Sequence, residues 1–164
     1  MISSEMNAAI NEQVGHEFAA MLQYVAIAAH FDGESLPVLA NHYYRQAEEE
    51  REHAMRFVKY LLDAGGKVAV PAIPAARGDF ASAEEAVQLS LERELTVTRQ
   101  INGLMDRAIK ENDHTSRNAL EWFVAEQLEE VSSAETLLRV VQRAGERGLL
   151  FVEDSLARLH AESV

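Results

Sequence analysis

Two pairs of polar residues, each spaced three positions apart, stand out in this sequence: Glu50-x-x-His53 and Gln127-x-x-Glu130. Residues at i and i+3 project from the same face of a helix, so each pair can present two polar groups together if its segment is helical. Carboxylate and imidazole ligands without sulfur suit iron(II) or manganese, and zinc could also bind. The pairs therefore indicate a metal site, provided that they lie on inward helix faces.

The elements that must carry these residues are long helices. The chain has 164 residues, of which 48% are hydrophobic and only three are proline. Alanine, leucine, glutamate and arginine dominate, which is a helix-forming composition. We expect an all-α chain with a single domain over residues 1–164, in which a bundle spans about 4–144. Apolar periodicity predicts helices over about 4–31, 36–64, 82–112 and 113–144, followed by a short C-terminal helix over about 149–160.

The connections between the predicted helices determine their directions. Breaks of about two to four residues join the first helix to the second and the third to the fourth, so each pair should form an antiparallel hairpin. The segment KVAVPAIPAARGDFA, residues 67–81, separates helices two and three. Fully extended, it spans about 50 Å, which exceeds the ~42 Å length of a 28-residue helix. Helices two and three can therefore be parallel, as in a ferritin-like four-helix bundle with one long crossover.

Each predicted helix has a mostly apolar inward seam that is interrupted near its middle by acid or amide. The interruptions are Glu17, Glu50, Glu94, Gln127 and Glu130. Because all lie near mid-helix, they meet at one height whichever way the helices run, and no lysine or arginine lies on these seams. A buried ion without a partner costs several kcal/mol, against about 5–15 kcal/mol for the stability of a whole domain. We therefore expect a metal cation between them, or partial protonation or hydration when the site is empty.

With this pattern, the whole chain resembles the bacterial non-haem ferritins. The likeness rests on Glu17, Glu50-x-x-His53, Glu94 and Gln127-x-x-Glu130, with Tyr24 one heptad beyond Glu17. The resemblance implies that Glu17, Glu50 and His53 bind one iron and that Glu94 and Glu130 bind a second. It also implies that Glu50 bridges the two irons and that Gln127 lies beside the second.

Further roles follow from the same resemblance. Glu49, Glu126 and Glu129 correspond to a third, inward-lying iron site that shares Glu130. Tyr24 corresponds to a tyrosine that donates an electron during oxidation. The segment 149–160 corresponds to the fifth helix, which in the family packs around the four-fold axis of a 24-subunit shell; the alternative for this segment is a simple cap on the bundle.

Particular residues separate the chain from two related families. Bacterioferritins carry Glu-x-x-His on the fourth helix and a haem-binding methionine beside the second-helix glutamate, where this chain has Gln127-x-x-Glu130 and Arg51. Rubrerythrin-like proteins usually add iron bound by cysteine, and this chain contains no cysteine. The expected cofactor is therefore iron, two ions per centre with a third site beside them, and no haem.

The predicted function is iron storage by a ferroxidase that oxidises Fe²⁺ with dioxygen, or peroxide, and keeps the product as ferric oxide mineral. The net charge of −12 argues against nucleic acid and anionic membranes as partners and is compatible with attracting cations. No apolar run approaches the ~18 residues of a membrane span, and the first residues do not resemble a signal peptide. We expect a cytoplasmic homo-oligomer. The alternatives are a di-iron oxidase or peroxidase with another substrate, and a helical interaction module whose acids are incidental.

Overall fold

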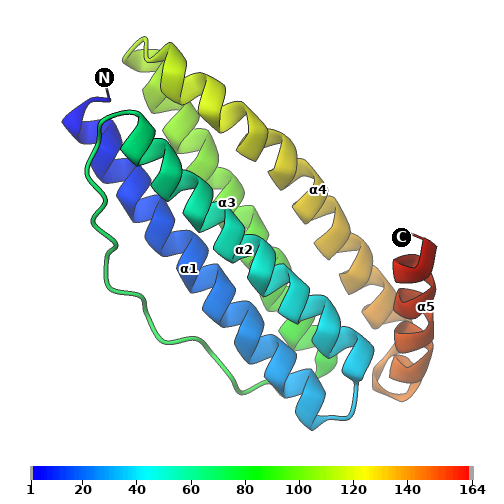
Figure 1. The fold of residues 1–164 in the computed structure, drawn as a ribbon. Helices are drawn as coiled ribbons and strands as arrows, with labels where there is room; N and C mark the ends of the chain where they lie inside the picture. Colours follow the sequence, from blue (N-terminus) through cyan, green and yellow to red (C-terminus); the bar gives the residue numbers. More distant parts are fainter. Residues whose placement is uncertain (1, 163–164) are drawn as a thin grey trace.

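The computed structural model describes the backbone of residues 2–162 and the side chains of residues 2–158. Four long helices lie side by side: α1 (Ser4–Gly33), α2 (Pro37–Asp63), α3 (Ala83–Lys110) and α4 (His114–Ala144). A short 3-10 helix, η1 (Glu146–Gly148), leads into α5 (Leu149–Glu162), which lies at an angle against one end of the bundle (Figure 1). The residues described contain no strand, which confirms the predicted all-α class.

Capping side chains explain why the helices begin where the sequence predicts. Ser3, Ser82 and Asp113 precede α1, α3 and α4, and each accepts a hydrogen bond from the backbone N–H three residues later. Such bonds satisfy N–H groups that have no partner within the helix. Pro37 begins α2, and Gly145, with a φ of 61°, follows the last residue of α4. The predicted ends differ from the observed ones by two residues or fewer.

The connections run as predicted. Helix α1 packs mainly against α2, and α3 packs mainly against α4. The crossover after α2, drawn in green, runs the length of the bundle beside α1 before α3 begins (Figure 1). Helices α2 and α3 are therefore parallel, and the four-helix bundle with one long crossover is confirmed.

Side-chain amides of α1 hold the crossover along this path. The amide of Asn11 donates to the carbonyl of Lys67 at 2.8 Å and accepts from the N–H of Ala69 at 2.6 Å. The amide of Gln23 bonds the backbone of Arg77 in the same two ways, at 2.7 and 3.0 Å. The extended crossover has no neighbouring strand to bond its backbone. These side-chain bonds supply partners for backbone groups that lie close to the bundle.

Replacing Gly15 with alanine should destabilise the protein, because α1 and the crossover touch at this residue. A Cβ atom there would lie 2.3 Å from Cγ of Pro71. We expect the free energy of unfolding to fall by about 1–2 kcal/mol, since overpacking outweighs the helix preference of alanine. Gly103→Ala in α3 is the matched control, because no atom lies within 4 Å of its added Cβ. Thermal unfolding should show a lower Tm for the first variant only; equal Tm values would contradict this contact.

The buried apolar side chains form two clusters with a polar layer between them. One cluster includes Phe31 and Tyr43, and the other includes Ile10 and Phe57. On each of the four long helices, the residues of the two clusters are separated in sequence by the predicted acid or amide positions. The polar residues therefore occupy one layer across the bundle, as their mid-helix positions predict.

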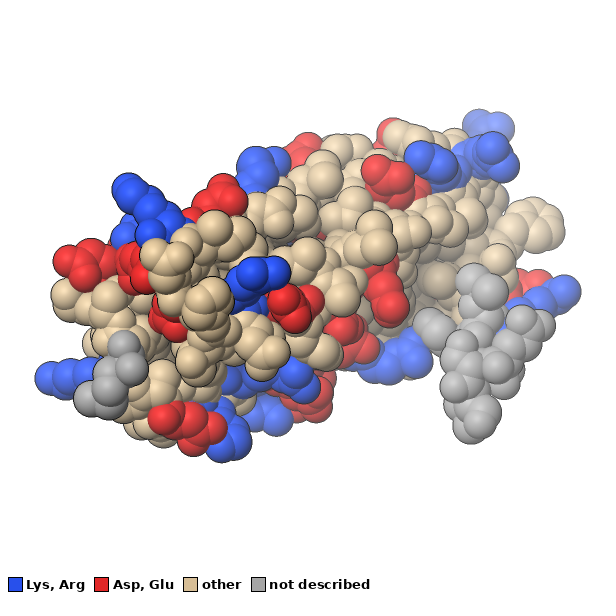
Figure 2. Space-filling model, turned by 90° about the horizontal axis from the view of Figure 1, so that it is seen from above, with Lys and Arg blue, Asp and Glu red and all other residues tan. Residues whose placement is uncertain are grey.

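The exterior is charged without a single dominant sign on the face that Figure 2 shows, where acidic and basic side chains alternate over the surface. The net charge of −12 is therefore not gathered into one patch on this face. Within the described residues, every helix is too short or too polar to cross a membrane.

Candidate metal centre

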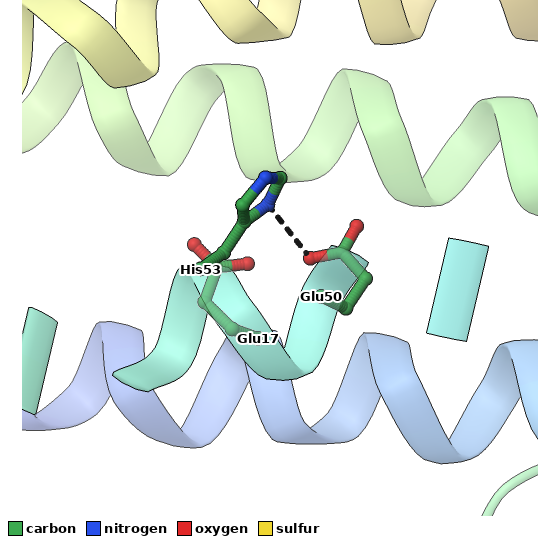
Figure 3. A group of neighbouring side chains, drawn as sticks. All are labelled: Glu17, Glu50 and His53. Carbon is green, nitrogen blue, oxygen red and sulfur yellow. Dashed lines mark ion pairs between the residues drawn. The ribbon is translucent and has the colours of Figure 1, made fainter. Parts of the chain in front are cut away.

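Glu17 of α1 meets Glu50 and His53 of α2 in the polar layer (Figure 3). One potential ligand atom of each residue lies within 4.8 Å of the others. His53 Nδ1 is 3.3 Å from Glu50 Oε2. The exposed fractions are 0% for Glu17, 3% for Glu50 and 8% for His53, so water has little access. These three residues are the set predicted for the first iron, and the structure brings them together.

A second group joins His53 to two carboxylates of α4. Potential ligand atoms of His53, Glu126 and Glu130 also lie within 4.8 Å of one another. Glu130 is buried and Glu126 is half-buried. The resemblance places Glu130 at the second iron and also, with Glu126, in the third site, and in the structure both carboxylates lie beside the same imidazole. Glu126 therefore lies beside Glu130, the residue that the predicted third site shares with the second iron.

Glu94 of α3 belongs to the same layer but is held by two hydrogen-bond donors. The hydroxyl of Tyr24 donates to Glu94 Oε1, and Nε2 of Gln127 donates to Oε2 at 3.1 Å. Glu94 is 1% exposed, and its charge helps to raise the pKa of Glu50 and of Glu130, after burial itself. Tyr24 and Gln127 thus lie beside this carboxylate, which the resemblance assigns to the second iron.

The buried carboxylates lack the partners that would neutralise them. Oε2 of Glu17 and Oε2 of Glu50 accept no hydrogen bond from any described residue. Among the described residues, the buried glutamates of the layer form one ion pair, which joins Glu50 to His53. None of these glutamates pairs with a lysine or arginine in that part of the chain. Burial first, and then the charge of Glu50, raises the pKa of Glu17 well above its usual range. Orphaned oxygens next to an imidazole fit a cation, whose charge would offset this burial.

Glu130 shows the same effect with a defined value. Burial, followed by the charges of Glu94 and Glu49, raises its pKa to about 8. Burial also raises the pKa of Glu50 well above its usual range, with the charges of Glu94 and Glu130 adding to it. The carboxyls of the layer therefore repel one another electrostatically when no cation lies between them.

The other two residues predicted for the third site lie further out. Glu49 is exposed and accepts a hydrogen bond from Gln46. Partial burial of its carboxyl raises the pKa of Glu49, and the charge of Glu126 contributes to the rise. Glu129 is exposed and lines a groove of about 480 Å³ with His42. Among the described residues, neither Glu49 nor Glu129 belongs to the two metal-ligating groups, so the third site stays a prediction.

Sequence reasoning missed Gln13, which contacts a proposed ligand directly. Its Nε2 donates to Glu17 Oε1 at 3.0 Å, and its side chain is 2% exposed. Gln13 precedes Glu17 by one helical turn, so the amide and the carboxylate lie on the same face of α1. A glutamine four residues before a seam glutamate was the signal that could have found it.

Aromatic packing fixes the other side of the imidazole. The ring of Trp122 meets the ring of His53 edge-on, with 5.4 Å between the ring centres. The guanidinium of Arg56 lies 3.6 Å above the centre of the Trp122 ring. Phe123 contacts the same imidazole at 6.1 Å. These contacts restrict the orientation of the His53 ring.

Comparison with known proteins addresses the family to which this bundle belongs. The family profile of the ferritin-like domain matches residues 7–144. The chain belongs to the ferritin family. This ferritin is 44% identical over 157 residues to the ferritin BfrB of Mycolicibacterium smegmatis, covering 96% of this chain and 86% of that protein. It is 36% identical over 166 residues to the bacterial non-heme ferritin of Staphylococcus saprophyticus, covering 99% of each.

Solved structures agree with this membership. A structure described as a novel open pore ferritin from the hyperthermophilic archaeon Archaeoglobus fulgidus superposes with a TM-score of 0.92 and 33% identity. The match covers 95% of this ferritin and 98% of the archaeal chain. The resemblance to bacterial non-haem ferritins is therefore confirmed, and with it the assignment to an iron-binding, iron-storing family.

Proposed function

We propose that this ferritin oxidises Fe²⁺ at the buried carboxylate layer and stores the ferric product as an oxide mineral inside a cytoplasmic homo-oligomeric shell of 24 subunits. The observation that carries the proposal is the layer itself. Four carboxylates from four helices, Glu17, Glu50, Glu94 and Glu130, are buried around His53 without a lysine or arginine among their ion pairs in the described chain. Iron ions supply the missing charge, and they are the substrate.

The donor set suits two iron ions. Glu17, Glu50 and His53 are the proposed ligands of one ion, and Glu94 and Glu130 those of the other, with Glu50 reaching both. Hard carboxylate oxygens favour Fe³⁺ over Fe²⁺, so they lower the potential of the pair and favour oxidation. Each of two Fe²⁺ ions gives up one electron, and one dioxygen takes both electrons and two protons to form hydrogen peroxide. Peroxide can accept electrons from further Fe²⁺ in the same way.

Acidic residues of α2 and α4 lie between this centre and the surface. Glu126 is half-buried and shares a possible metal-ligating group with His53 and Glu130. The charge of Glu126 adds to the rise in the pKa of Glu49 that burial causes, and Glu129 is exposed one residue before Glu130. We propose that Glu49, Glu126 and Glu129 form the third iron site and relay iron between the centre and the mineral.

Tyr24 is the proposed electron donor beside the second iron. Its hydroxyl donates to Glu94, so a carboxylate is in place to accept the phenolic proton when the ring loses an electron. Tyr24→Phe should slow aerobic Fe²⁺ oxidation on the order of tenfold, comparable to the loss of one charged hydrogen bond. The matched control is Tyr43→Phe, because the buried hydroxyl of Tyr43 bonds Ser90 rather than a carboxylate. Equal rates for both variants, measured by stopped-flow absorbance, would contradict the donor role.

The iron content of the assembled particle distinguishes storage from the alternative of an oxidase with another substrate. Aerobic loading with several hundred Fe²⁺ per particle, followed by gel filtration and elemental analysis, should recover the iron in a particle near the mass of 24 subunits. An oxidase would keep only the few ions of its centre. A protein that retains no iron after gel filtration would contradict storage.

A further inference from the structure

The two oxygens of the Glu17 carboxylate have different surroundings. Oε1 accepts the 3.0 Å hydrogen bond from Gln13 Nε2, whereas Oε2 is buried and has no hydrogen-bond partner among the described residues. Glu17 is 0% exposed and Gln13 is 2% exposed, so water does not compete for this bond. Both side chains project from one face of α1, one turn apart, and the helix therefore sets the direction from which the amide approaches.

This asymmetry affects how Glu17 can bind a cation. An oxygen that accepts an amide N–H has one lone-pair direction occupied, and the bond fixes the plane of the carboxylate. The unpartnered Oε2 keeps its lone pairs for the group that Glu17 forms with Glu50 and His53 (Figure 3). Oε1 keeps only its second lone pair for a cation, so the bond from Gln13 favours binding through Oε2 over binding through both oxygens.

We propose that Gln13 is a positioning residue that holds Glu17 as a one-oxygen ligand for a divalent cation bound with Glu50 and His53. This inference rests on the proposed function. Gln13 touches no metal and acts through the orientation of the carboxylate. Its amide is neutral, so it orients Glu17 without the positive charge with which a lysine would compete against the metal.

A second buried amide shows that the arrangement at Glu17 is particular to that site. Gln127 donates to Glu94 at 3.1 Å from the neighbouring helix, and the hydroxyl of Tyr24 donates to the other oxygen of the same carboxylate. Both oxygens of Glu94 are therefore engaged, whereas Glu17 keeps one free. Loss of either amide should consequently affect a different ion of the pair.

Zn²⁺ binding tests the inference without any redox reaction. Gln13→Met keeps the length of the side chain and removes the N–H donor, so the affinity of one zinc site should fall about 10- to 100-fold, as for other outer-shell partners. Gln13→Asn keeps the amide but is one methylene too short, and should weaken the same site. The matched control is Gln88→Met on α3, because Gln88 makes the same i, i+4 bond to Glu92 at 3.1 Å on the surface.

Isothermal calorimetry of the metal-free variants gives the affinities, and anomalous scattering from zinc-soaked crystals identifies the weakened site. The expected loss is at Glu17 for Gln13→Met and at Glu94 for Gln127→Met, with wild-type affinity for Gln88→Met. Wild-type affinity in both Gln13 variants would overturn the inference and leave the proposed function standing, even if their Tm values fell. A wild-type protein that binds no zinc in this layer would instead overturn the proposed function, and the inference with it.

Discussion

Glu50→Gln is expected to abolish fast aerobic Fe²⁺ oxidation. Glu50 is 3% exposed and forms the buried group with Glu17 and His53. Burial raises its pKa, and the charges of Glu94 and Glu130 raise it further. In the proposed centre Glu50 reaches both ions, so its loss removes a ligand from each. Glutamine has the same shape but no charge. The initial rate should fall by more than the roughly 10- to 100-fold that loss of an outer-shell partner costs.

The matched control for this variant is Glu52→Gln, two residues further along the same helix. Glu52 is exposed, so the substitution removes the same charge without reaching the polar layer. Stopped-flow measurement at two Fe²⁺ per subunit should give the wild-type rate for the control. Glu17→Ala and Glu130→Ala should each lose fast oxidation as well, while circular dichroism shows that the bundle still folds. Wild-type rates in these variants would show that the buried layer does not take part in the oxidation.

Glu130→Gln is expected to stabilise the metal-free protein at pH 8 while it weakens metal binding. The pKa of Glu130 is raised to about 8 by burial first and then by the charge of Glu94, whereas an unfolded chain has about 4.3. Below the unfolded value both states are protonated. Between the two values only the folded state keeps its proton, so stability falls as the pH rises, and the loss is complete above about 8. The total effect is on the order of several kcal/mol.

Calorimetry of the metal-free protein at pH 5 and pH 8 checks this prediction. Glu130→Gln should raise the Tm at pH 8 by roughly 5–10 °C. It should also reduce the difference between the Tm at pH 5 and the Tm at pH 8. Glu121→Gln serves as the control, since Glu121 is exposed on the same helix and forms only a surface pair with Arg117 at 3.7 Å. If the Tm of both variants depended on pH as in the wild type, burial would not raise the pKa of the Glu130 carboxyl in the folded protein.

Much of the fold follows from patterns that the sequence states locally. Ser82 and Asp113 indicate where their helices begin, because a capping side chain bonds a backbone N–H only three residues away. The parallel arrangement of α2 and α3 could be predicted from the length of the crossover alone. The route along α1 could not be predicted, because it depends on Asn11 and Gln23 bonding the backbone of residues some 55 positions away.

The candidate site divides in the same way. Glu17, Glu50 and His53 come together because helical period and seam position determine which side chains share a layer. The grouping of Glu126 with His53 was not predictable, because it depends on the rotation of α4 about its own axis, which the seam fixes only approximately. Gln13 was overlooked because it lies outside the predicted seam, where an amide has no evident role until its partner is known.

Oxygen uptake at limiting iron tests the central claim most directly. Metal-free protein is mixed with Fe²⁺ in increments under air, and dissolved oxygen is followed with an electrode. A centre that holds two irons predicts a fast phase that saturates at two Fe²⁺ per subunit, with one dioxygen consumed for every two Fe²⁺. Uptake no faster than in a protein-free solution, or a fast phase without saturation at two Fe²⁺ per subunit, would contradict the assignment of the buried layer as a ferroxidase centre.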